Sequence, residues 1–402
     1  MKKVVVIGAG YGGLRAVEKL ATYDDIEITL IDKNPYHYLQ TEVYGYIAGR
    51  FNIHDITIDL RHWCNGFDEK ISFLEEEVIH IDFDIQNIRC KHLAESVAYD
   101  YLIIATGAQT RFYASIDGLE AHSHGVKTLE RAYEFRKMFE NIIYDKLEYS
   151  SKKKSDKIYI RIGGAGLSGV EIATEMAYII STYSKTIGKR TQEIEISLID
   201  ASETILPEMD TYIIKETEKR LSELGVEILT NAFIRKVDNT DIYLTDERIL
   251  PYHVLIFTGG IMAKSIDTSP RVHTNQLAQY RVNKYLNIEN YTNAFAIGDC
   301  IEITDNEGNI QAPTAQLAEK SAEYVAKAIR RQIQDQYIDI FDAHSEGVFV
   351  ALGGHYAVGE IFNTIRVKGY SAYLLKKLIT YSYYLGLKFR INTGYKNRIQ
   401  KE

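Results

Sequence analysis

The stretch Val4-Val5-Val6-Ile7-Gly8-Ala9-Gly10-Tyr11-Gly12-Gly13 joins a short β-branched run to a glycine-rich turn. The chain repeats the pattern at Ile158-Tyr159-Ile160-Arg161-Ile162-Gly163-Gly164-Ala165-Gly166-Leu167-Ser168-Gly169, and the two turns begin 156 residues apart, at Gly8 and Gly164. Such glycines allow a tight turn, close approach of the backbone to a pyrophosphate, and close packing of a helix on a strand. One copy can arise by chance, but two copies predict two Rossmann-like units, each for one dinucleotide.

An acidic residue ends the next expected strand of each unit. Strand 26–31 leads to Asp32, and strand 194–199 leads to Asp200. A carboxylate at this place accepts hydrogen bonds from the hydroxyls of a ribose. Asp200 favours NADH over NADPH, because residues 201–203 include no Arg that would bind a 2′-phosphate.

Three further segments complete the two units. Residues 100–107 and 254–260 each predict a strand that runs into a turn of small residues, and 294–299 predicts a strand with an acid at its tip. We also expect helices over 14–20 and from 170 to about 181, with their positive N-termini facing the pyrophosphates.

Composition and charge exclude several classes of protein. The chain has 402 residues, of which 46% are hydrophobic and 25% charged, as is typical of a globular protein. The net charge of −8 gives no indication of nucleic-acid binding. Cys64, Cys90 and Cys300 lie far apart, so we expect neither a metal site nor a redox disulfide built from sequence neighbours. We find no apolar window long enough to span a membrane, and the run 4–7 is too short for a signal peptide.

In order and spacing, these segments resemble the flavoproteins that have two dinucleotide-binding domains. The resemblance implies that the first unit binds FAD and that an NADH-binding unit is inserted into it. By the same resemblance, Asp32 contacts the FAD ribose, the stretch Thr106-Gly107 lies along the FAD, and Asp299 contacts the ribityl chain. The residues implied for FAD are Gly8, Gly10, Gly12, Gly13, Asp32, Lys33, Thr106, Gly107, Asp299 and Gln316. Those implied for NADH are Gly164, Gly166, Gly169, Asp200, Gly259 and Gly260.

Two motifs resemble one family within this group, the type II NADH dehydrogenases. Pro313-Thr314-Ala315-Gln316-Leu317-Ala318-Glu319-Lys320 is similar to their Ala-Gln-x-Ala-x-Gln motif, and the stretch from Gly164 to Glu171 is similar to their nicotinamide-side motif. These proteins are single-subunit, non-proton-pumping NADH:quinone oxidoreductases of respiratory chains. The resemblance implies that hydride passes from NADH to FAD and two electrons then pass to a quinone, expected to be menaquinone. It assigns catalysis to Gln316, where flavin and quinone meet, and to Glu171, in a proton or hydrogen-bond network.

The chain departs from the motif at Lys320, where the family has a second Gln. A cation there changes the electrostatics of the quinone tunnel, or Lys320 pairs with Glu319 or Glu323 and leaves the tunnel altered. Two other functions therefore stay open: a soluble NAD(P)H:acceptor reductase that serves another electron carrier, and an NADH-sensing flavoprotein that does not turn over. We expect His37 to be a structural histidine and Cys300 to be a small buried residue.

The C-terminal segment is strongly basic. Residues 361–402 carry nine Lys or Arg and one acid, a net charge of +8, which leaves −16 for the rest of a chain whose total is −8. We expect a helix over 368–389, because apolar residues recur at helical spacing. One row is Tyr370, Tyr373, Leu374, Leu378, Tyr381 and Leu385, interrupted by Lys377, and a second row is Leu375, Ile379 and Tyr383.

Two apolar rows, tyrosines and flanking cations suit a helix that lies in a membrane surface. Each basic residue near an anionic leaflet contributes about 1 kcal/mol to such docking. The alternative is a dimer interface or a packed terminal helix. The family resemblance implies a peripheral, monotopic protein at the cytoplasmic face of the cell membrane, and a homodimer.

The predicted fold is α/β, with two Rossmann-like dinucleotide-binding domains and a C-terminal α-helical membrane-docking segment. The FAD domain covers 1–150 and 265–340, the NADH domain covers 151–264, and the docking or dimer segment covers 341–402. The polar, basic stretch 150–157 marks the first boundary, and we expect the chain to return near 259–264.

Overall fold

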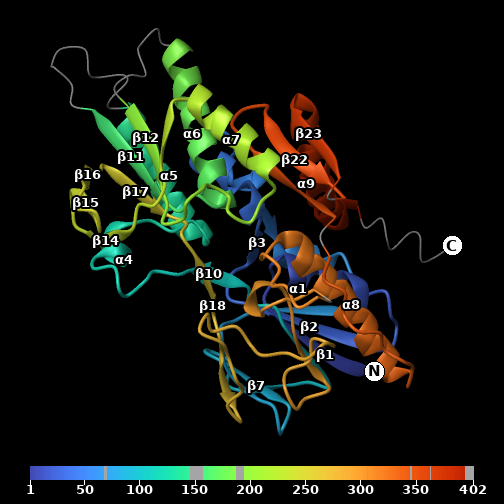
Figure 1. Cartoon of the computed structure of the whole chain (residues 1–402). Helices are drawn as coiled ribbons and strands as arrows, with labels where there is room; N and C mark the ends of the chain where they lie inside the picture. Colours follow the sequence, from blue (N-terminus) through green and yellow to red (C-terminus); the bar gives the residue numbers. More distant parts are fainter. Residues whose placement is uncertain are drawn as a thin grey trace.

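The computed structural model describes residues 1–67, 70–144, 157–186, 194–305, 307–344, 346–362 and 364–393. Two bodies, each built on a parallel sheet, lie side by side and are joined by short strands between them (Figure 1). We name the body around the first fingerprint the first unit, the body around the second fingerprint the second unit, and residues 341–393 the tail.

The first unit is built on a five-stranded parallel sheet of order β20-β9-β1-β2-β5. Its strands are β1 (Lys2–Ile7), β2 (Ile26–Asp32), β5 (Ile71–Glu75), β9 (Tyr101–Ile104) and β20 (Ala294–Ala296). Apolar side chains such as Val4, Ile28 and Leu102 are fully buried, as expected for a parallel sheet covered by helices. The helices are α1 (Tyr11–Leu20), α2 (Val43–Ile47), α3 (Leu60–Asn65) and α8 (Ala315–Ile333).

The second unit repeats this plan with a four-stranded parallel sheet of order β13-β12-β11-β17. Its strands are β11 (Ile158–Gly163), β12 (Ile194–Ile199), β13 (Val226–Leu229) and β17 (Val254–Phe257), and its helices include α6 (Leu167–Thr186) and α7 (Thr211–Glu223). Arg161 lies inside β11, and its guanidinium is satisfied there by Glu195, Ser197 and the carbonyl of Pro251. The two Rossmann-like units predicted from the fingerprints are therefore confirmed.

Smaller elements complete both units. Beside the first sheet lie β6 (Val78–Asp82), β7 (Asn87–Cys90), β8 (Val97–Ala98) and β19 (Asp267–Ser269), and the hairpin β3 (Tyr36–Tyr38) with β4 (Thr57–Asp59). Beside the second lie β14 (Ile234–Val237), β15 (Asp241–Leu244) and β16 (Ile249–Pro251). Short helices are η1 (Gln40–Glu42), η2 (Ile53–Asp55), α4 (Leu119–His122) and η5 (Gly298–Cys300), and α5 (Leu129–Tyr144) is longer.

The chain passes between the units along a two-stranded connection. Strand β10 (Ala108–Thr110) pairs antiparallel with β18 (Ile261–Ala263), in the middle of the molecule (Figure 1). Shortly after β10, Asp117 forms a β-bridge with Lys236, and His124 forms one with Ile256, both in the second unit. We infer that the chain first crosses near β10, earlier than the predicted boundary, whose polar stretch lies outside the described residues except for Lys157.

The tail holds a three-stranded antiparallel sheet that the sequence analysis did not predict. Its strands are β21 (Gly347–Ala351), β22 (Ala357–Ile361) and β23 (Ile365–Gly369), and the long helix α9 (Tyr370–Thr393) follows directly. The predicted helix start at Lys368 is wrong, because Lys368 pairs with Val358 across the sheet. The sheet lies beside α7 of the second unit, whereas α9 packs on α3 of the first (Figure 1).

Most cations in the described part of the tail are paired with carboxylates, whereas the sequence analysis expected them to face a membrane. Five of the six that lie in the described part of the tail form ion pairs with carboxylates. These pairs are Arg366–Asp210, Lys368–Glu216, Lys376–Glu171, Lys377–Glu42 and Arg390–Glu18. The sixth, Lys388, lies over the ring of Tyr384. The charge asymmetry of the chain therefore serves largely to fasten the tail to both units.

Candidate functional site

The two fingerprint turns have the same geometry. Their first glycines have positive φ angles, 102° at Gly8 and 109° at Gly164. A Cβ atom on Gly8 would lie 2.3 Å from the carbonyl oxygen of Ala105, and one on Gly164 would lie 2.6 Å from the amide nitrogen of Gly259. Each turn thus packs against the small-residue segment expected to close its own unit, and only glycine fits there.

The remaining glycines divide into packing positions and open positions. A Cβ atom on Gly13 would lie 1.8 Å from the oxygen of Gly8, and one on Gly169 would lie 1.9 Å from the oxygen of Gly164. A Cβ atom on Gly10 or Gly166 would meet no described atom within 4 Å. These two positions leave space at the helix N-terminus, where the backbone N–H groups and helix dipole attract a pyrophosphate.

The two acids hold their turns in the same way. The N–H of Ala9 donates to Oδ2 of Asp32 (2.7 Å), and the N–H of Ala165 donates to Oδ2 of Asp200. In each unit, the other oxygen of the carboxylate accepts a hydrogen bond from the backbone N–H of the residue two positions later in the chain. Burial raises the pKa of Asp32. Lys33, next to Asp32, is exposed.

Further residues of the first unit form a cradle that fits FAD. The Oγ1 atom of Thr106 is buried and has no partner among the described residues, as expected for a group that a ligand satisfies. Gly107 has a φ of 64° and an open position at its Cβ. Asp299 lies in η5 with one carboxylate oxygen 3.9 Å from Nζ of Lys127. Gly12 packs on Ile297 and Ala318, which brings the start of α8 to the same cradle.

On the second unit, Gly259 and Gly260 follow β17 and close the corresponding space. The hydroxyl of Tyr113 donates to the carbonyl oxygen of Gly259 (3.2 Å), and the N–H of Arg111 donates to that of Gly260 (3.0 Å). Both donors come from the segment that follows β10. The connection between the units therefore also shapes the second dinucleotide position.

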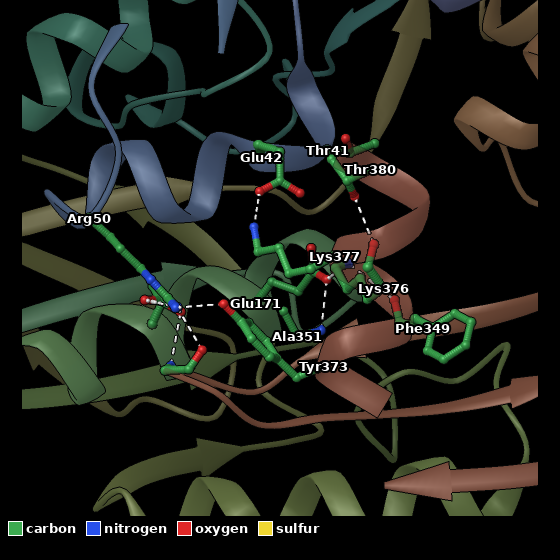
Figure 2. Close-up of polar contacts among 12 residues, drawn as sticks. Thr41, Glu42, Arg50, Glu171, Phe349, Ala351, Tyr373, Lys376, Lys377 and Thr380 are labelled. Carbon is green, nitrogen blue, oxygen red and sulfur yellow. Dashed lines mark hydrogen bonds and ion pairs between the residues drawn. The ribbon is translucent and has the colours of Figure 1, made fainter. Parts of the chain in front are cut away.

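Glu171 lies in the first turns of α6, and its carboxylate is buried where the second unit meets the tail (Figure 2). Its Oε1 atom accepts from the N–H of Ala351 (2.9 Å) and from Nζ of Lys376 (2.6 Å). Burial raises the pKa of Glu171, and the charge of Lys376 opposes this effect. The result is a buried, hydrogen-bonded acid whose cationic partner comes from α9.

Gln316 lies at the start of α8, where Thr314 caps the helix by accepting from the N–H of Leu317, as predicted. The Oε1 atom of Gln316 accepts from the N–H of Glu346 (3.3 Å). Glu346 directly precedes β21, and Ala351 ends that strand. Gln316 and Glu171 are therefore joined through one strand that the sequence analysis missed.

Lys320 turns away from the partners proposed for it. Its Nζ atom lies 2.8 Å from Oε1 of Glu346 and donates to the carbonyl of His344 (3.0 Å). Glu319 pairs with Arg15 instead (2.6 Å), and Glu323 pairs with Arg15 and Lys19. The alternative that Lys320 pairs with Glu319 or Glu323 is therefore wrong, because Arg15 on α1 holds both of these acids.

Sequence reasoning also missed two buried carboxylates next to Glu171. Glu175 follows Glu171 by one helical turn and is held by Arg50 (3.1 Å). Glu42 is held by Nζ of Lys377 (2.5 Å) (Figure 2). The spacing of Glu171 and Glu175 puts both on one face of α6. That spacing was visible in the sequence, but their cationic partners lie more than 100 residues away along the chain.

His37 is a structural histidine, as expected. It is buried, its Nδ1 atom lies 2.8 Å from the carbonyl oxygen of Ala9, and its Nε2 atom lies 3.1 Å from the hydroxyl of Tyr383 on α9. A neutral ring satisfies both contacts, with Nδ1–H donating and Nε2 accepting. Burial lowers the pKa of His37 to about 4.

Cysteine and metal chemistry find no support in the described part of the chain. Cys300 is buried and donates to the carbonyl of Ile297 (3.1 Å), and burial raises its pKa to about 11. All three cysteines are free and buried. Over the described ranges, no group of three or more His, Cys, Asp or Glu is arranged to hold a metal ion.

The chain is similar to known proteins along most of its length. The family model described as pyridine nucleotide-disulphide oxidoreductase matches residues 2–323. Proteins named type II NADH:quinone oxidoreductase from Staphylococcus saprophyticus and Staphylococcus aureus are 27% and 28% identical to this chain, each over 94% of both chains. These relatives confirm the resemblance to type II NADH dehydrogenases.

Solved structures share the fold. NDH2 of Plasmodium falciparum in complex with NADH has a TM-score of 0.84 at 20% identity, over 98% of this chain and 97% of that one. The sulfide:quinone oxidoreductase of Aquifex aeolicus has a TM-score of 0.79 at 19% identity, over 99% and 94%. The chain belongs to the pyridine nucleotide-disulphide oxidoreductase family.

The open and packed glycines predict opposite effects of one added methyl group. Gly10→Ala should weaken FAD retention and change the free energy of unfolding by no more than about 1 kcal/mol, because its Cβ points into the ligand space. Gly13→Ala should lower the free energy of unfolding by about 3 kcal/mol, because its Cβ meets backbone. Urea unfolding and the fluorescence of released FAD measure the two effects. Wild-type FAD retention in Gly10→Ala would contradict the cradle.

His37 predicts a pH effect on stability. Its pKa is lower in the folded protein, about 4, than in the unfolded chain, about 6.5. Between these values the unfolded chain binds a proton that the folded protein does not, so His37 makes the protein less stable as pH falls from about 6.5 to 4. His37→Gln, which keeps a donor and an acceptor, should reduce this loss. Parallel urea unfolding of both proteins at pH 7.5 and 5 tests it, and identical losses would refute it.

Proposed function

We propose that this chain is an FAD-dependent NADH:quinone oxidoreductase that does not pump protons. The net reaction is NADH + H⁺ + quinone → NAD⁺ + quinol. The observation that carries the proposal is the link through β21 between Gln316, at the edge of the first cradle, and Glu171, at the start of the second unit's helix. The names of the relatives from two staphylococci support the same reaction.

The first unit holds FAD through the open glycine turn, Asp32, Thr106, Gly107 and Asp299, with Lys33 beside them. FAD, when bound, accepts the hydride of NADH and passes two electrons to a quinone. The start of α8 directs its N-terminus toward the cradle, and such a terminus stabilises negative charge. The protein's own contribution is therefore to bind, orient and supply an electrostatic environment.

The second unit holds NADH against the first. Gly164, Gly166 and Gly169 form the turn for the pyrophosphate, and Asp200 accepts from the adenine-side ribose. The segment 201–203 offers no Arg for a 2′-phosphate, which favours NADH over NADPH. Gly259 and Gly260 line the same space across from this turn.

Glu171 is the group that would hold a proton at this site. It accepts a hydrogen bond from the ammonium of Lys376, and burial raises its pKa, which allows the carboxylate to take up a proton. The carbonyl of Phe349 also accepts from Nζ of Lys376 (3.3 Å), which fixes the ammonium against β21 (Figure 2). Gln316 orients the quinone, expected to be menaquinone, because its amide group can donate to a quinone carbonyl.

Lys320 need not prevent quinone binding. Its ammonium is neutralised by Glu346, so the pair adds no net charge beside Gln316. The same glutamate holds Gln316 through its backbone N–H. The substitution of the family's second Gln is thus compensated by a partner from the tail.

We propose that the protein docks on the cytoplasmic face of the membrane through the outer face of α9. Large apolar side chains are exposed there, although most nearby cations are engaged elsewhere. These side chains are Tyr370, Leu374, Leu378, Ile379, Tyr381 and Phe389. Within the described ranges, none of the helices is both long and apolar enough to cross a bilayer. Contiguous exposed apolar surface of this kind marks an interaction site. The homodimer implied by the resemblance stays a prediction.

The reaction is tested by anaerobic mixing of the yellow protein with one equivalent of NADH, followed by a water-soluble menaquinone analogue. We expect flavin absorbance to bleach rapidly and then to recover rapidly. Bleaching without recovery would refute quinone reductase activity. Recovery with an acidic protein carrier alone would then identify a soluble reductase, and slow recovery with every acceptor would identify an NADH sensor.

Docking through apolar contacts predicts a specific pattern of vesicle binding. Leu374→Ser combined with Leu378→Ser should weaken binding to anionic vesicles at least ten-fold, because burial of one leucine is worth about 1.5–3 kcal/mol. Wild-type binding should survive moderate salt, since few tail cations are free to meet lipid. Phe233→Ser with Ile249→Ser, equally exposed on the second unit, is the control. Sedimentation with vesicles measures both, and equal binding of the two variants would refute the docking face.

A further inference from the structure

The guanidinium of Arg50 joins all three parts of the molecule. Arg50 lies in the loop after α2, in the first unit, and its Nη1 atom lies 3.1 Å from Oε1 of Glu175 on α6 of the second unit. The same Nη1 donates to the carbonyl of Gly354 in the tail (2.6 Å), and Nη2 donates to the hydroxyl of Tyr373 on α9 (3.0 Å). Figure 2 shows Arg50 together with its partner Tyr373.

Glu175 is as closely held as the arginine. Its side chain is 1% exposed, and its Oε2 atom accepts from the N–H of Gly354 (3.2 Å). In a similar way Glu171, one turn earlier on α6, accepts hydrogen bonds from the N–H of Ala351 and from the ammonium of Lys376. Two carboxylates on one helix face of the second unit thus bind one tail turn, and Arg50 ties this assembly to the first unit.

Stability alone does not explain this arrangement. A buried ion pair loses the hydration of both ions, and this cost offsets most of the attraction, so well-packed apolar residues are often equally stabilising. What a buried, multidentate arginine does add is a single allowed geometry, because its planar fork fits its acceptors in one orientation only. An arginine of this kind, placed where the two nucleotide-binding units meet, therefore indicates a role in fixing their relative orientation.

We propose that Arg50 is a positioning residue that fixes the angle between the first and second units, and thereby the distance between the two bound dinucleotides. The proposal rests on the proposed function. Hydride transfer requires the reacting atoms to approach to about 3–3.5 Å, and a displacement of about 1 Å can cost two orders of magnitude in rate. Lys377, which binds Glu42 of the first unit, and Lys376, which binds Glu171 of the second, fix α9 across the same junction.

The test uses the full-length protein with both charges of the pair removed together, because a lone buried charge could prevent folding. The variant is Arg50→Gln with Glu175→Gln. The control is Arg330→Gln with Asp25→Asn, which removes a more exposed ion pair that lies within the first unit alone. Arg330 also lies over the ring of Tyr23, as Arg50 lies over that of Tyr373.

The first readout is the distance between two spin labels, and it does not require catalysis. Spin labels are attached at Ile85→Cys in the first unit and Ile249→Cys in the second, both exposed sites, while the native cysteines are buried. We expect the distribution of distances between the labels to broaden in the Arg50 variant and to stay narrow in the control. An unchanged distribution in the Arg50 variant would overturn the proposal.

The second readout is flavin bleaching by NADH in a stopped-flow instrument. We expect a roughly ten-fold slower limiting rate with an almost unchanged dissociation constant for NADH, because the binding turn is intact and only alignment is lost. A lower unfolding temperature with a wild-type limiting rate would mean a merely structural role and would overturn the proposal. Tyr373→Phe and Arg50→Lys, which each weaken only part of the junction, should give smaller effects in the same direction.

The two proposals fail in different ways. Bleaching by NADH requires no quinone, so a wild-type protein that bleaches but does not reduce quinone contradicts the proposed function and still permits the test of Arg50. Conversely, a wild-type protein that reduces quinone, with an Arg50 variant identical to it in label distances and bleaching rate, contradicts only the role of Arg50.

Discussion

Buried carboxylates need cations, and in this protein the cations come from other parts of the chain. Glu42 belongs to the first unit, Glu171 and Glu175 belong to the second, and the tail supplies Lys376 and Lys377. Burial raises the pKa of Glu171 and Glu175, and their cationic partners oppose this effect and favour the charged form. Because no single part can neutralise its own acids, the two units and the tail must be assembled for the site to exist. The tail is therefore a structural component of the site, and its proposed outer face for lipid is a second property of the same helix.

The need of buried carboxylates for cations also gives the basic C-terminal segment a structural role. The charge of +8 on residues 361–402, against −16 on the rest of the chain, suggested electrostatic attraction to lipid, but most of the described tail cations pair with carboxylates of the body. What is left on the outer face of α9 is apolar side chains. The inner side of α9 carries cations beside buried apolar residues such as Ala372 and Leu387, while its outer face is largely apolar. This differs from the usual packed helix with a polar outer face, and it suits a helix between a buried ionic site and a membrane.

Much of the fold could be predicted from local sequence, because a strand, a glycine turn and a helix form from neighbouring residues. The sequence was sufficient for both fingerprints, for the cap at Thr314 and for the structural role of His37. Errors arose where partners lie far apart. Strand β21 has only a short apolar run between glycines, and nothing near Arg50 in the sequence indicates Glu175. The predicted helix start at Lys368 was wrong because the apolar alternation of β23 runs directly into the helical pattern. The pairing of Lys320 with a nearby acid was wrong because Arg15 holds both Glu319 and Glu323.

The most direct test of this description is an experimental structure of the protein with FAD and a menaquinone analogue bound. We predict that the quinone ring lies between Gln316 at the start of α8 and the inner side of α9, with Lys376 still bound to Glu171. The FAD should lie along the Gly107 turn, with its ribityl chain beside Asp299. A quinone ring bound away from Gln316, or α9 detached from Glu171 and Glu42 in the presence of both ligands, would contradict the central claim that the tail completes the site.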